Sequence, residues 1–394
     1  MEHNIYIVIA LILLFGLILG KMLRRVGLTQ VLAYLIAGII IGPILKFHLP
    51  NQFNAFTTGI TLSFVGYKVG LSFSMSFLKR MGKKVIIILI TEVIITSLVV
   101  WLFIYLLTKN LVLSIVLASL APATAPAGTV AVLRDLRARG TLTDVSIAIV
   151  GLDDAAAIII YAVGIMWAKA IVGGHTSIAS SFIHPLWEIF GAVAVGGIIG
   201  FILSYSAKKV YLTQDHTFVI TVATIMLTWG LAKFIGVSAI LSCMVLGTTI
   251  INLNRSIAIL SDKLLEGIMT PIFILFFAII GMEIDFSHLL TILSIVVMYC
   301  VARSIGKMIG CGLGGVFAKS ETKIKKYLGI ALLNQAGVAV GLAFFAAQEL
   351  SGSGLSNTII TLMATTTALF QILSPLGTQY AVKKAREDNQ YGRA

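Results

Sequence analysis

The chain has 394 residues, of which 58% are hydrophobic and only 11% are charged, and its mean hydropathy is +1.02. Ordinary soluble domains carry about 25% charged residues, so this composition excludes such a domain and indicates a polytopic membrane protein. In a soluble protein the net charge of +13 would indicate a nucleic-acid partner. In a membrane protein the same charge can follow from topology, so the positions of the basic residues decide between the two readings.

Thirteen apolar segments predict an all-α polytopic membrane protein with about 13 transmembrane helices. The first segment runs directly into Lys21 without a small-residue cleavage site, so we expect a retained helix and not a signal peptide. The break between the eighth and ninth segments rests on Lys233 and Gly236 alone. The segments lie near residues 4–20, 29–46, 55–78, 84–107, 110–134, 143–171, 184–207, 217–233, 236–252, 263–281, 287–317, 325–349 and 356–382.

The basic residues explain the net charge as topology. With the N-terminus outside, 22 of the 29 Lys and Arg residues fall in cytoplasmic loops or the C-terminal tail, against Lys46, Lys109 and Lys233 outside. Such an asymmetry sets the orientation of a membrane protein. We therefore expect a multi-pass protein of a cell inner membrane or plasma membrane, in contact with the lipid bilayer, with a cytoplasmic C-terminus and no nucleic-acid partner.

Two parts of the sequence resemble each other. Residues 31–42 align with residues 237–247, and residues 64–73 align with residues 276–284. Either match alone could arise by chance between apolar strings, but their shared order indicates that helices 1 to 6 repeat as helices 8 to 13. Matching helices are offset by seven, an odd number, so the repeats have opposite orientations, as in many secondary transporters. We expect a single transporter domain with repeat one at about 4–171, a connecting helix at about 184–207, repeat two at about 217–382 and a tail at 383–394.

Matching interruptions occur in the fifth helix of one repeat and its partner, the twelfth helix. Pro122 and Pro126 flank Thr124 in the fifth helix, and each proline removes a backbone donor. Asn334 and Gln335 interrupt the twelfth helix. Transporters of this kind bind their substrate where helices are interrupted near the midplane. A lone proline kink is often only structural, but the mirrored pair indicates two discontinuous helices.

Six charged residues lie well inside the predicted spans. A charge near the bilayer centre costs at least about 2.5 to 3.5 kcal/mol on insertion scales, so each such residue is a candidate for function, with a structural ion pair as the alternative. The three acidic residues are Glu92, Asp153 and Asp154, and the three basic residues are Lys68, Arg303 and Lys307.

The adjacent pair Asp153 and Asp154 is the sharpest feature of the sequence. A rise of about 1.5 Å per residue places the pair about 15 Å from the predicted start of its helix near Thr143, close to the midplane. Neighbouring helical residues point about 100° apart, so one carboxylate can face an ion cavity while the other meets a fixed cation. A carboxyl group that holds H⁺ has lost the charge that binds Na⁺. This competition is enough to couple proton flow to cation flow.

Arg303 and Lys307 are four residues apart and so share one face of the eleventh helix. A desolvated lysine can titrate, whereas arginine hardly can. We therefore predict a dynamic pairing of Lys307 with Asp153 and a structural role for Arg303, with Glu92 as its candidate partner. No partner is assigned to Lys68.

These residues also carry a resemblance to a known family. The segments 31–43, 122–126, 151–154, 303–307 and 334–339 together resemble the monovalent cation:proton antiporter superfamily, and the chain is similar over nearly its whole length to the NapA-type bacterial sodium/proton antiporters. The Asp-Asp pair with a lysine is the specific part of this likeness, because electroneutral relatives typically carry Asn-Asp with arginine.

The resemblance implies the NhaA/NapA-like antiporter fold, an inverted repeat with two crossed discontinuous helices. It implies that Asp154 is the main ion- and proton-binding carboxylate, that Asp153 is the salt-bridge partner of Lys307, and that Thr124 lies at the helix crossing. It also implies a core domain and a dimerisation domain, joined in a homodimer and moving as an elevator. Ser72, where relatives often have glutamate, and Lys68 depart from the family pattern and bear on cation choice.

The sequence leaves three functions open. The first is electrogenic exchange of Na⁺ or Li⁺ for H⁺, and the second is exchange of K⁺ for H⁺ on the same fold. The third is a sodium-coupled solute symporter or a channel, although the spans offer little polar side-chain material for a solute pocket. We expect no enzyme activity and no cofactor, since the spans contain no nucleophile-base-acid set and the cysteines and histidines lack metal-ligand spacing.

Overall fold

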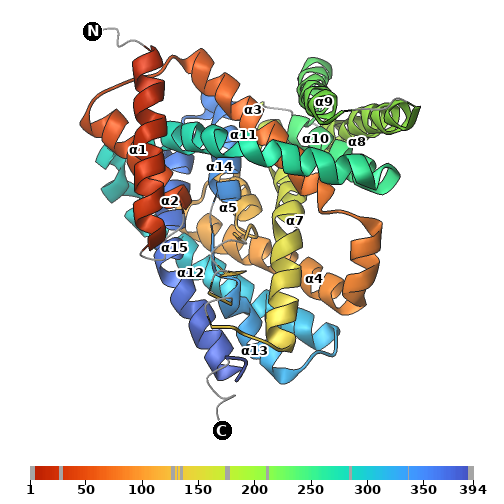
Figure 1. Ribbon diagram of the computed structural model, residues 1–394. Helices are drawn as coiled ribbons and strands as arrows, with labels where there is room; N and C mark the ends of the chain where they lie inside the picture. Colours follow the sequence, from red (N-terminus) through yellow and green to blue (C-terminus); the bar gives the residue numbers. More distant parts are fainter. Residues whose placement is uncertain are drawn as a thin grey trace.

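The computed structural model describes residues 5–25, 30–125, 129–130, 132–133, 136–173, 178–209, 213–283, 286–335 and 337–388. Within these ranges every regular element is a helix, and Figure 1 shows how the helices are arranged. They are α1 (Ile5–Arg25), α2 (Gln30–Ile39) with the π-helical turn η1 (Ile40–Ile44), α3 (Asn51–Leu71), α4 (Met75–Thr108), α5 (Leu111–Leu120), α7 (Thr141–Val172), α8 (Ile178–Lys209), α9 (Gln214–Ile235), α10 (Ala239–Leu253), α11 (Arg255–Met282), α12 (Phe286–Phe317), α13 (Thr322–Ala331), α14 (Gly337–Glu349), the 3₁₀ turn η2 (Ser351–Ser353) and α15 (Ser356–Lys384).

The helices account for the predicted apolar segments, with three boundaries corrected, one of which is the start of α8 at Ile178 instead of residue 184. Among the described residues, eight helices are long and apolar enough to cross a membrane, and four further apolar helices are shorter. The predicted segment 55–78 is wrong at its end, because α3 stops at Leu71 and α4 starts at Met75 and bends at Gly82, where φ is +77°. The predicted start at residue 263 is also wrong, since α11 begins at Arg255 with Asn254 as its side-chain cap. The break at Gly236 is confirmed, as this glycine ends α9 with φ +77°.

The helices pack as two groups. One group, called the core group here, consists of α4, α5, α7 and α12 to α15; the other, called the scaffold group, consists of α1, α2, α3 and α9 to α11. Contacts are dense within each group and sparse between them, and α8 packs mainly on α10. In Figure 1, α3 and α11 cross the upper part of the molecule, while α4, α12 and α13 lie below.

Within the scaffold group, α2 crosses α11 and α3 crosses α10 through pairs of glycines. In each pair, a Cβ atom on either glycine would overlap the carbonyl oxygen three residues before the other glycine. The backbones can therefore approach closely only without side chains at these points. The crossings are Gly38 with Gly281, against the carbonyl groups of Ala278 and Leu35, and Gly70 with Gly247, against the carbonyl groups of Met244 and Tyr67.

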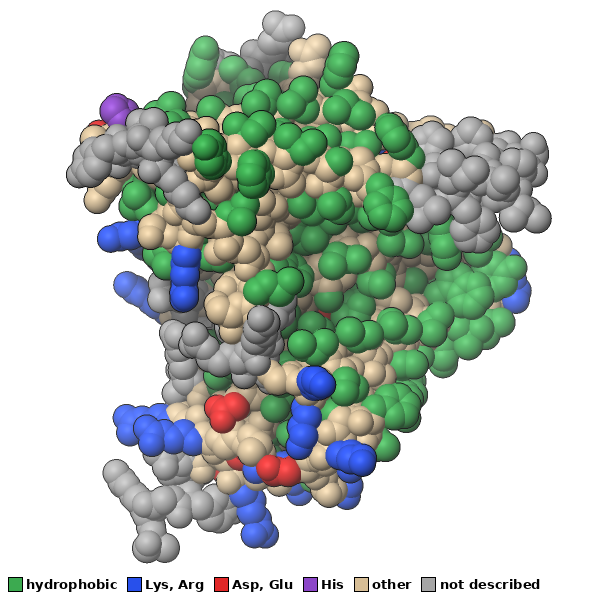
Figure 2. All heavy atoms as spheres, turned by 90° about the vertical axis from the view of Figure 1, so that its right-hand side faces the viewer, with side chains coloured by type: hydrophobic (Ala, Val, Ile, Leu, Met, Phe, Trp, Pro, Cys, Tyr) green, Lys and Arg blue, Asp and Glu red, His purple; other side chains and the backbone are tan. Residues whose placement is uncertain are grey.

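The surface fits a multi-pass membrane protein. Large apolar side chains are exposed along most of the long helices, including Leu98, Phe201 and Leu373. Figure 2 shows them covering the upper and right-hand parts of one face, with Lys and Arg side chains gathered toward its lower left and lower end. Apolar exposure on this scale marks a lipid-facing surface.

Candidate functional site

The two interrupted helices meet in the core group. Helix α5 ends at Leu120 and is followed by the non-helical residues 121–125, and α13 ends at Ala331 before the non-helical residues 332–335. The two segments hydrogen-bond to each other: the Ala125 N–H donates to the Asn334 carbonyl at 3.1 Å, and Asn334 Nδ2 donates to the Ala125 carbonyl at 3.0 Å. The interruptions predicted from the sequence thus lie side by side, and residues 121–125 together with residues 332–335 are called the crossing here. Pro126 falls outside the described residues.

Arg303 binds the backbone of the crossing, and its predicted pairing with Glu92 is wrong. The buried guanidinium group donates to the carbonyl oxygens of Ala121 at 2.8 Å, Ala123 at 2.8 Å and Leu333 at 2.7 Å. These carbonyls follow the C-terminal ends of α5 and α13, where the partial negative charge of a helix is found. A delocalised, permanent cation satisfies several such groups at once, which explains a structural role for arginine here.

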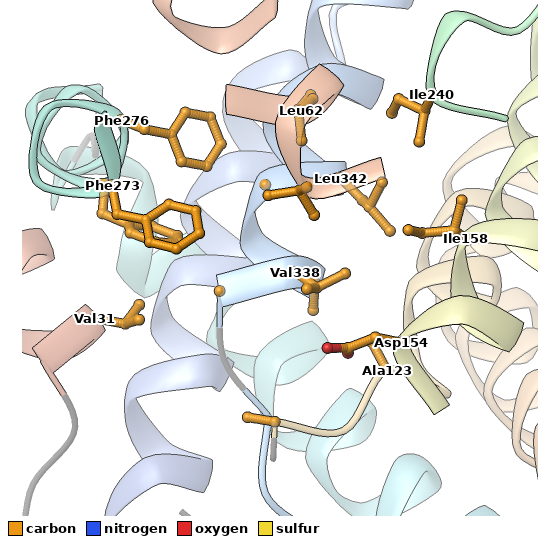
Figure 3. Close-up of a pocket in the computed structure, with 16 residues that line it drawn as sticks. Val31, Leu62, Ala123, Asp154, Ile158, Ile240, Phe273, Phe276, Val338 and Leu342 are labelled. Carbon is orange, nitrogen blue, oxygen red and sulfur yellow. The ribbon is translucent and has the colours of Figure 1, made fainter. Parts of the chain in front are cut away.

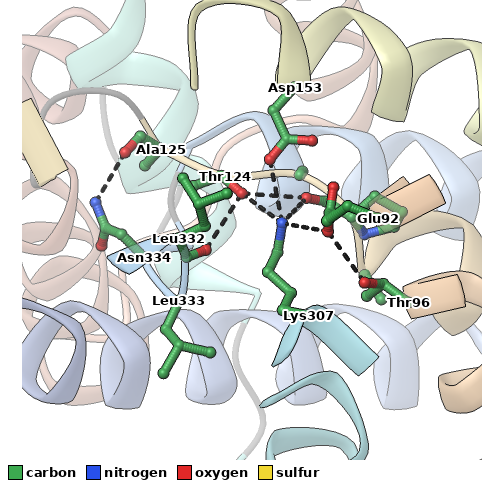
Figure 4. A network of polar contacts seen from close by, with 12 residues as sticks. Glu92, Thr96, Thr124, Ala125, Asp153, Lys307, Leu332, Leu333 and Asn334 are labelled. Carbon is green, nitrogen blue, oxygen red and sulfur yellow. Dashed lines mark hydrogen bonds and ion pairs between the residues drawn. The ribbon is translucent and has the colours of Figure 1, made fainter. Parts of the chain in front are cut away.

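Lys307 joins the crossing to two carboxylates (Figure 4). Its ammonium nitrogen lies 2.8 Å from Glu92 Oε1 and 3.1 Å from Asp153 Oδ2, and it also donates to the Pro122 carbonyl at 2.7 Å and to Thr124 Oγ1 at 2.6 Å. The side chains of Lys307, Glu92 and Asp153 are all fully buried. The structure therefore brings Lys307 together with Asp153, as the helix-face argument expects, and adds Glu92 as a second acidic partner.

The buried network keeps unused bonding capacity. Thr96 donates to Glu92 Oε1 at 3.0 Å, but within the described part of the chain Glu92 Oε2 and Asp153 Oδ1 have no hydrogen-bond partner. Buried oxygens without a partner are rare in folded proteins and call for an explanation. Here they are positions at which a proton or a cation can bind.

Asp154 points away from this network into a cavity of about 200 Å³ between the two helix groups (Figure 3). Residues from α3 and α11, including Leu62 and Phe276, form the scaffold side, and Ile158 and Val338 lie on the core side. Asp154 is the one charged side chain among the described residues that line the cavity, and no described residue forms a hydrogen bond or ion pair with it. The N-terminus of α14 at Gly337 also reaches the cavity.

The remaining predicted site residues occupy different places. Gln335 donates to the Tyr299 hydroxyl at 3.0 Å beside the crossing. Lys68 does not lie at the depth expected from the sequence: its side chain is 27% exposed near the end of α3 and pairs with Asp262 at 2.8 Å. The sequence left Lys68 without a partner because Asp262 lies in a stretch, residues 255–262, that it did not assign to a helix.

The sequence matches the model of the transmembrane sodium/hydrogen exchanger family over residues 9–383. The chain belongs to the sodium/hydrogen exchanger family. Membership identifies it as a multi-pass secondary transporter that performs cation/proton antiport, and not as an enzyme. No curated protein matches the sequence itself.

Solved structures similar to this exchanger support the same fold. The sodium proton antiporter MjNhaP1 from Methanocaldococcus jannaschii at pH 8 superposes with a TM-score of 0.76 at 18% identity, over 95% of this chain and 97% of the other. An electron-microscopy structure of the same antiporter gives a TM-score of 0.72 at 20% identity, over 100% of this chain and 99% of the other. At these identities the likeness shows the fold alone.

The candidate site thus has two chemical halves on one helix. Asp153 belongs to a fully buried, ion-paired network at the crossing, and Asp154 faces a cavity. Counting Glu92 with them, the site contains three carboxylates and two fixed cations, Lys307 and Arg303. When all five groups are charged the site has one negative charge in excess, which favours an entering cation or proton.

Proposed function

We propose that the protein exchanges Na⁺ or Li⁺ for H⁺ and that the exchange is electrogenic. The single observation that carries this proposal is the position of Asp154 in the cavity between the two helix groups, next to Asp153 in the Lys307 network. An anionic oxygen at a cavity inside the membrane protein is a ligand for which a small monovalent cation and a proton can compete. Both compete for the same lone pairs, so binding of one excludes the other.

In the proposed cycle, Asp154 takes the cation and Asp153 changes partners. A cation bound at Asp154 can also attract the unpartnered Asp153 Oδ1 and draw this carboxylate away from Lys307. Lys307 then keeps Glu92 at 2.8 Å as its counter-ion and does not become a lone buried charge. When the cation leaves, protons can occupy both aspartates, so more than one proton moves for each cation and the exchange carries net charge.

The same proposal covers the architecture and the membrane topology. Each glycine crossing joins one helix of residues 4–171 to one helix of residues 217–382, and the two crossings repeat one packing arrangement, which supports an inverted repeat of these two halves with α8 as the connector. Sparse contacts between the groups support an elevator movement of the core against the scaffold. We further propose a homodimer in a cell inner or plasma membrane, with the N-terminus outside and the tail cytoplasmic.

Proteoliposomes with an imposed pH gradient and a trapped pH-sensitive dye test the exchange. Addition of Na⁺ or Li⁺ should dissipate the gradient, and Asp154→Asn should abolish the signal. The matched control is Asp262→Asn, which removes the same charge from an exposed pair at the end of α3 and should leave exchange intact. Unchanged exchange in Asp154→Asn contradicts the assignment.

Side-by-side addition of Na⁺, Li⁺ and K⁺ at equal concentration tests the choice of cation. A response to K⁺ alone favours the K⁺/H⁺ alternative on the same fold. Electrogenicity is tested with valinomycin and K⁺ on both sides of the membrane, because relief of charge build-up should accelerate an unequal exchange. No acceleration supports one-for-one exchange and contradicts the proposed stoichiometry.

A further inference from the structure

The helix that carries Asp153 and Asp154 begins without a capping side chain of its own. The first four N–H groups of any helix lack partners inside it, and a side chain at the N-cap usually accepts from one of them. The N-cap of α7 is Gly140, which has no side chain and a φ of +146°. The missing acceptor has to come from elsewhere in the chain.

Glu387, in the segment after α15, supplies it. Its Oε1 accepts from the Leu142 N–H at 2.9 Å, and its Oε2 accepts from the Thr143 N–H at 2.8 Å and from the Thr143 hydroxyl at 2.9 Å. These are the second and third residues of α7, the positions that an N-cap serves. Glu387 is separated from Leu142 by 245 residues and is 3% exposed at its side chain.

The backbone holds this carboxylate in place. Beyond α15 the chain reverses at Arg386, where φ is +56°, and the Glu387 N–H donates to the Val382 carbonyl at 3.1 Å. The Arg139 N–H donates to the Glu387 carbonyl at 2.9 Å. A Cβ atom at Gly140 would overlap the Glu387 carboxyl group, so the glycine makes room for this cap.

The same carboxylate reaches the crossing through a second helix. Lys323, in the first turn of α13, donates to Glu387 Oε1 at 2.8 Å, and α13 ends where the non-helical backbone of the crossing begins. Glu387 therefore ties together the cytoplasmic ends of two helices whose other parts form the site. A shift of α7 along its axis would move Asp153 and Asp154 against Lys307 and the crossing by the same distance, because a helix moves as a rigid rod.

We propose that Glu387 is a positioning residue for the exchange reaction: it caps α7 from the far end of the chain and fixes the register of α7 against α13. This role of Glu387 rests on the proposed function, because the groups that Glu387 positions are Asp153 and Asp154, the proposed cation-binding residues. Its carboxylate also lies at the positive end of the α7 dipole, which adds to the hydrogen bonds.

The test compares Glu387→Gln and Glu387→Ala with Asp144→Asn in the purified, reconstituted full-length protein. Asp144 is an exposed acidic residue in the first turn of the same helix, so its variant removes a like charge without removing the cap. In folded Glu387→Ala, the KM for the transported cation should rise by up to about fivefold, the limit in which the whole free energy of a lost helix cap, about 1 kcal/mol, is taken from cation binding. Glu387→Gln, which keeps one acceptor oxygen, should lie between this variant and the wild type, and Asp144→Asn should match the wild type.

Amide hydrogen exchange provides a readout that does not depend on transport. The amides of Leu142 and Thr143 should exchange faster in both Glu387 variants and not in Asp144→Asn. A KM equal to that of the wild type in folded Glu387→Ala, or unchanged amide exchange, overturns the proposal. A wild-type protein that transports none of Na⁺, Li⁺ and K⁺ contradicts the proposed function instead, while the amide measurement still tests the cap.

Discussion

Lys307 is bonded to Glu92 at 2.8 Å, a shorter contact than the 3.1 Å that joins it to Asp153. One buried ammonium group thus pairs with two buried carboxylates from different helices, α4 and α7. In a simple ion pair the lysine loses its counter-ion when the carboxylate moves away, whereas Lys307 keeps one when either of its two carboxylates moves. In the proposed cycle the carboxylate that moves is Asp153, which is adjacent to Asp154 at the cavity.

This sharing predicts unequal losses of stability when each member of the network is neutralised. Lys307→Met leaves two carboxylates without a cation, so it should cost about 3 to 5 kcal/mol, the range for breaking a buried pair. Glu92→Gln and Asp153→Asn each leave the lysine paired and remove a like-charge repulsion, so each should cost less than half as much. Thermal unfolding in detergent, followed by size-exclusion chromatography, measures the difference.

The control for this series is Lys68→Met. Lys68 and Asp262 form an exposed pair, with side chains 27% and 44% accessible, and such pairs contribute about 0 to 1 kcal/mol. If Lys68→Met lowers the stability as much as Lys307→Met does, burial is not the reason for the large effect at Lys307.

The sequence predicts the fold and the charged residues of the candidate site better than it predicts which residues these charges bind. Hydropathy and loop charge indicate the helices, and prolines and an Asn-Gln pair indicate where two helices are interrupted, because these signals are local. The i, i+4 spacing of Arg303 and Lys307 predicts that they share one helix face, and in the structure both reach the crossing. It does not say which carboxylate each meets: Arg303 binds carbonyl groups and Glu92 binds Lys307, since helix rotation and depth are set by tertiary packing. Nothing local connects Glu387 to Gly140, because the pairing depends on a turn at the opposite end of the chain.

The glycine crossings predict sharply different effects of alanine within one helix. Gly281→Ala should destabilise the protein by about 1 to 3 kcal/mol, since its Cβ would overlap the Leu35 carbonyl in a contact between two backbones. Gly267→Ala in the same helix, α11, meets no atom within 4 Å and should be neutral or stabilising by up to about 1 kcal/mol through helix propensity. Thermal unfolding of the two variants measures both values, and equal effects would contradict the close approach.

The Glu387 cap predicts a defined pH dependence of stability. Burial opposes ionisation of this carboxyl group, but hydrogen bonds from Lys323 and from the Leu142 and Thr143 backbone outweigh it and lower the pKa of Glu387 below its ordinary value of 4.5. A group whose pKa is lower in the folded state stabilises the fold above its unfolded pKa and loses that contribution as the pH falls through the folded value. The neighbouring charged groups are Lys323 and Glu321, which lie 3.4 Å apart.

The difference in melting temperature between wild type and Glu387→Gln should therefore be constant from pH 6 to pH 9 and shrink below about pH 4.5. The cap is then a fixed element throughout the pH range in which exchange is measured, and not a pH switch. A difference that changes between pH 6 and pH 8 contradicts the lowered pKa of Glu387.

A cluster of ion pairs bridges the two helix groups at the end of α7 opposite the Glu387 cap. Glu349 at the end of α14, in the core group, pairs with Lys169 at 2.9 Å and with Lys233 of α9, in the scaffold group, at 2.5 Å. Lys169 also lies 3.6 Å from Glu188 of α8. These side chains line a cavity of about 210 Å³ whose wall includes Ala239. If the groups move against each other, the bond between Glu349 and Lys233 has to break.

Loss of that bond should shift the conformational equilibrium toward the state in which the cavity is open. A partly exposed pair contributes up to about 1 kcal/mol, or about fivefold in population. In a variant with the three native cysteines replaced and Cys introduced at Ala239, a membrane-impermeant maleimide should label several-fold faster when Glu349→Gln or Lys233→Met is added. Lys109→Met, whose lysine lies over the Tyr105 ring 5.9 Å from its centroid, is the control and should leave the labelling rate unchanged. The charge-reversed pair Lys233→Glu with Glu349→Lys should restore slow labelling. If the labelling rate is the same with and without Glu349→Gln, the bond between Glu349 and Lys233 does not hold the two helix groups together.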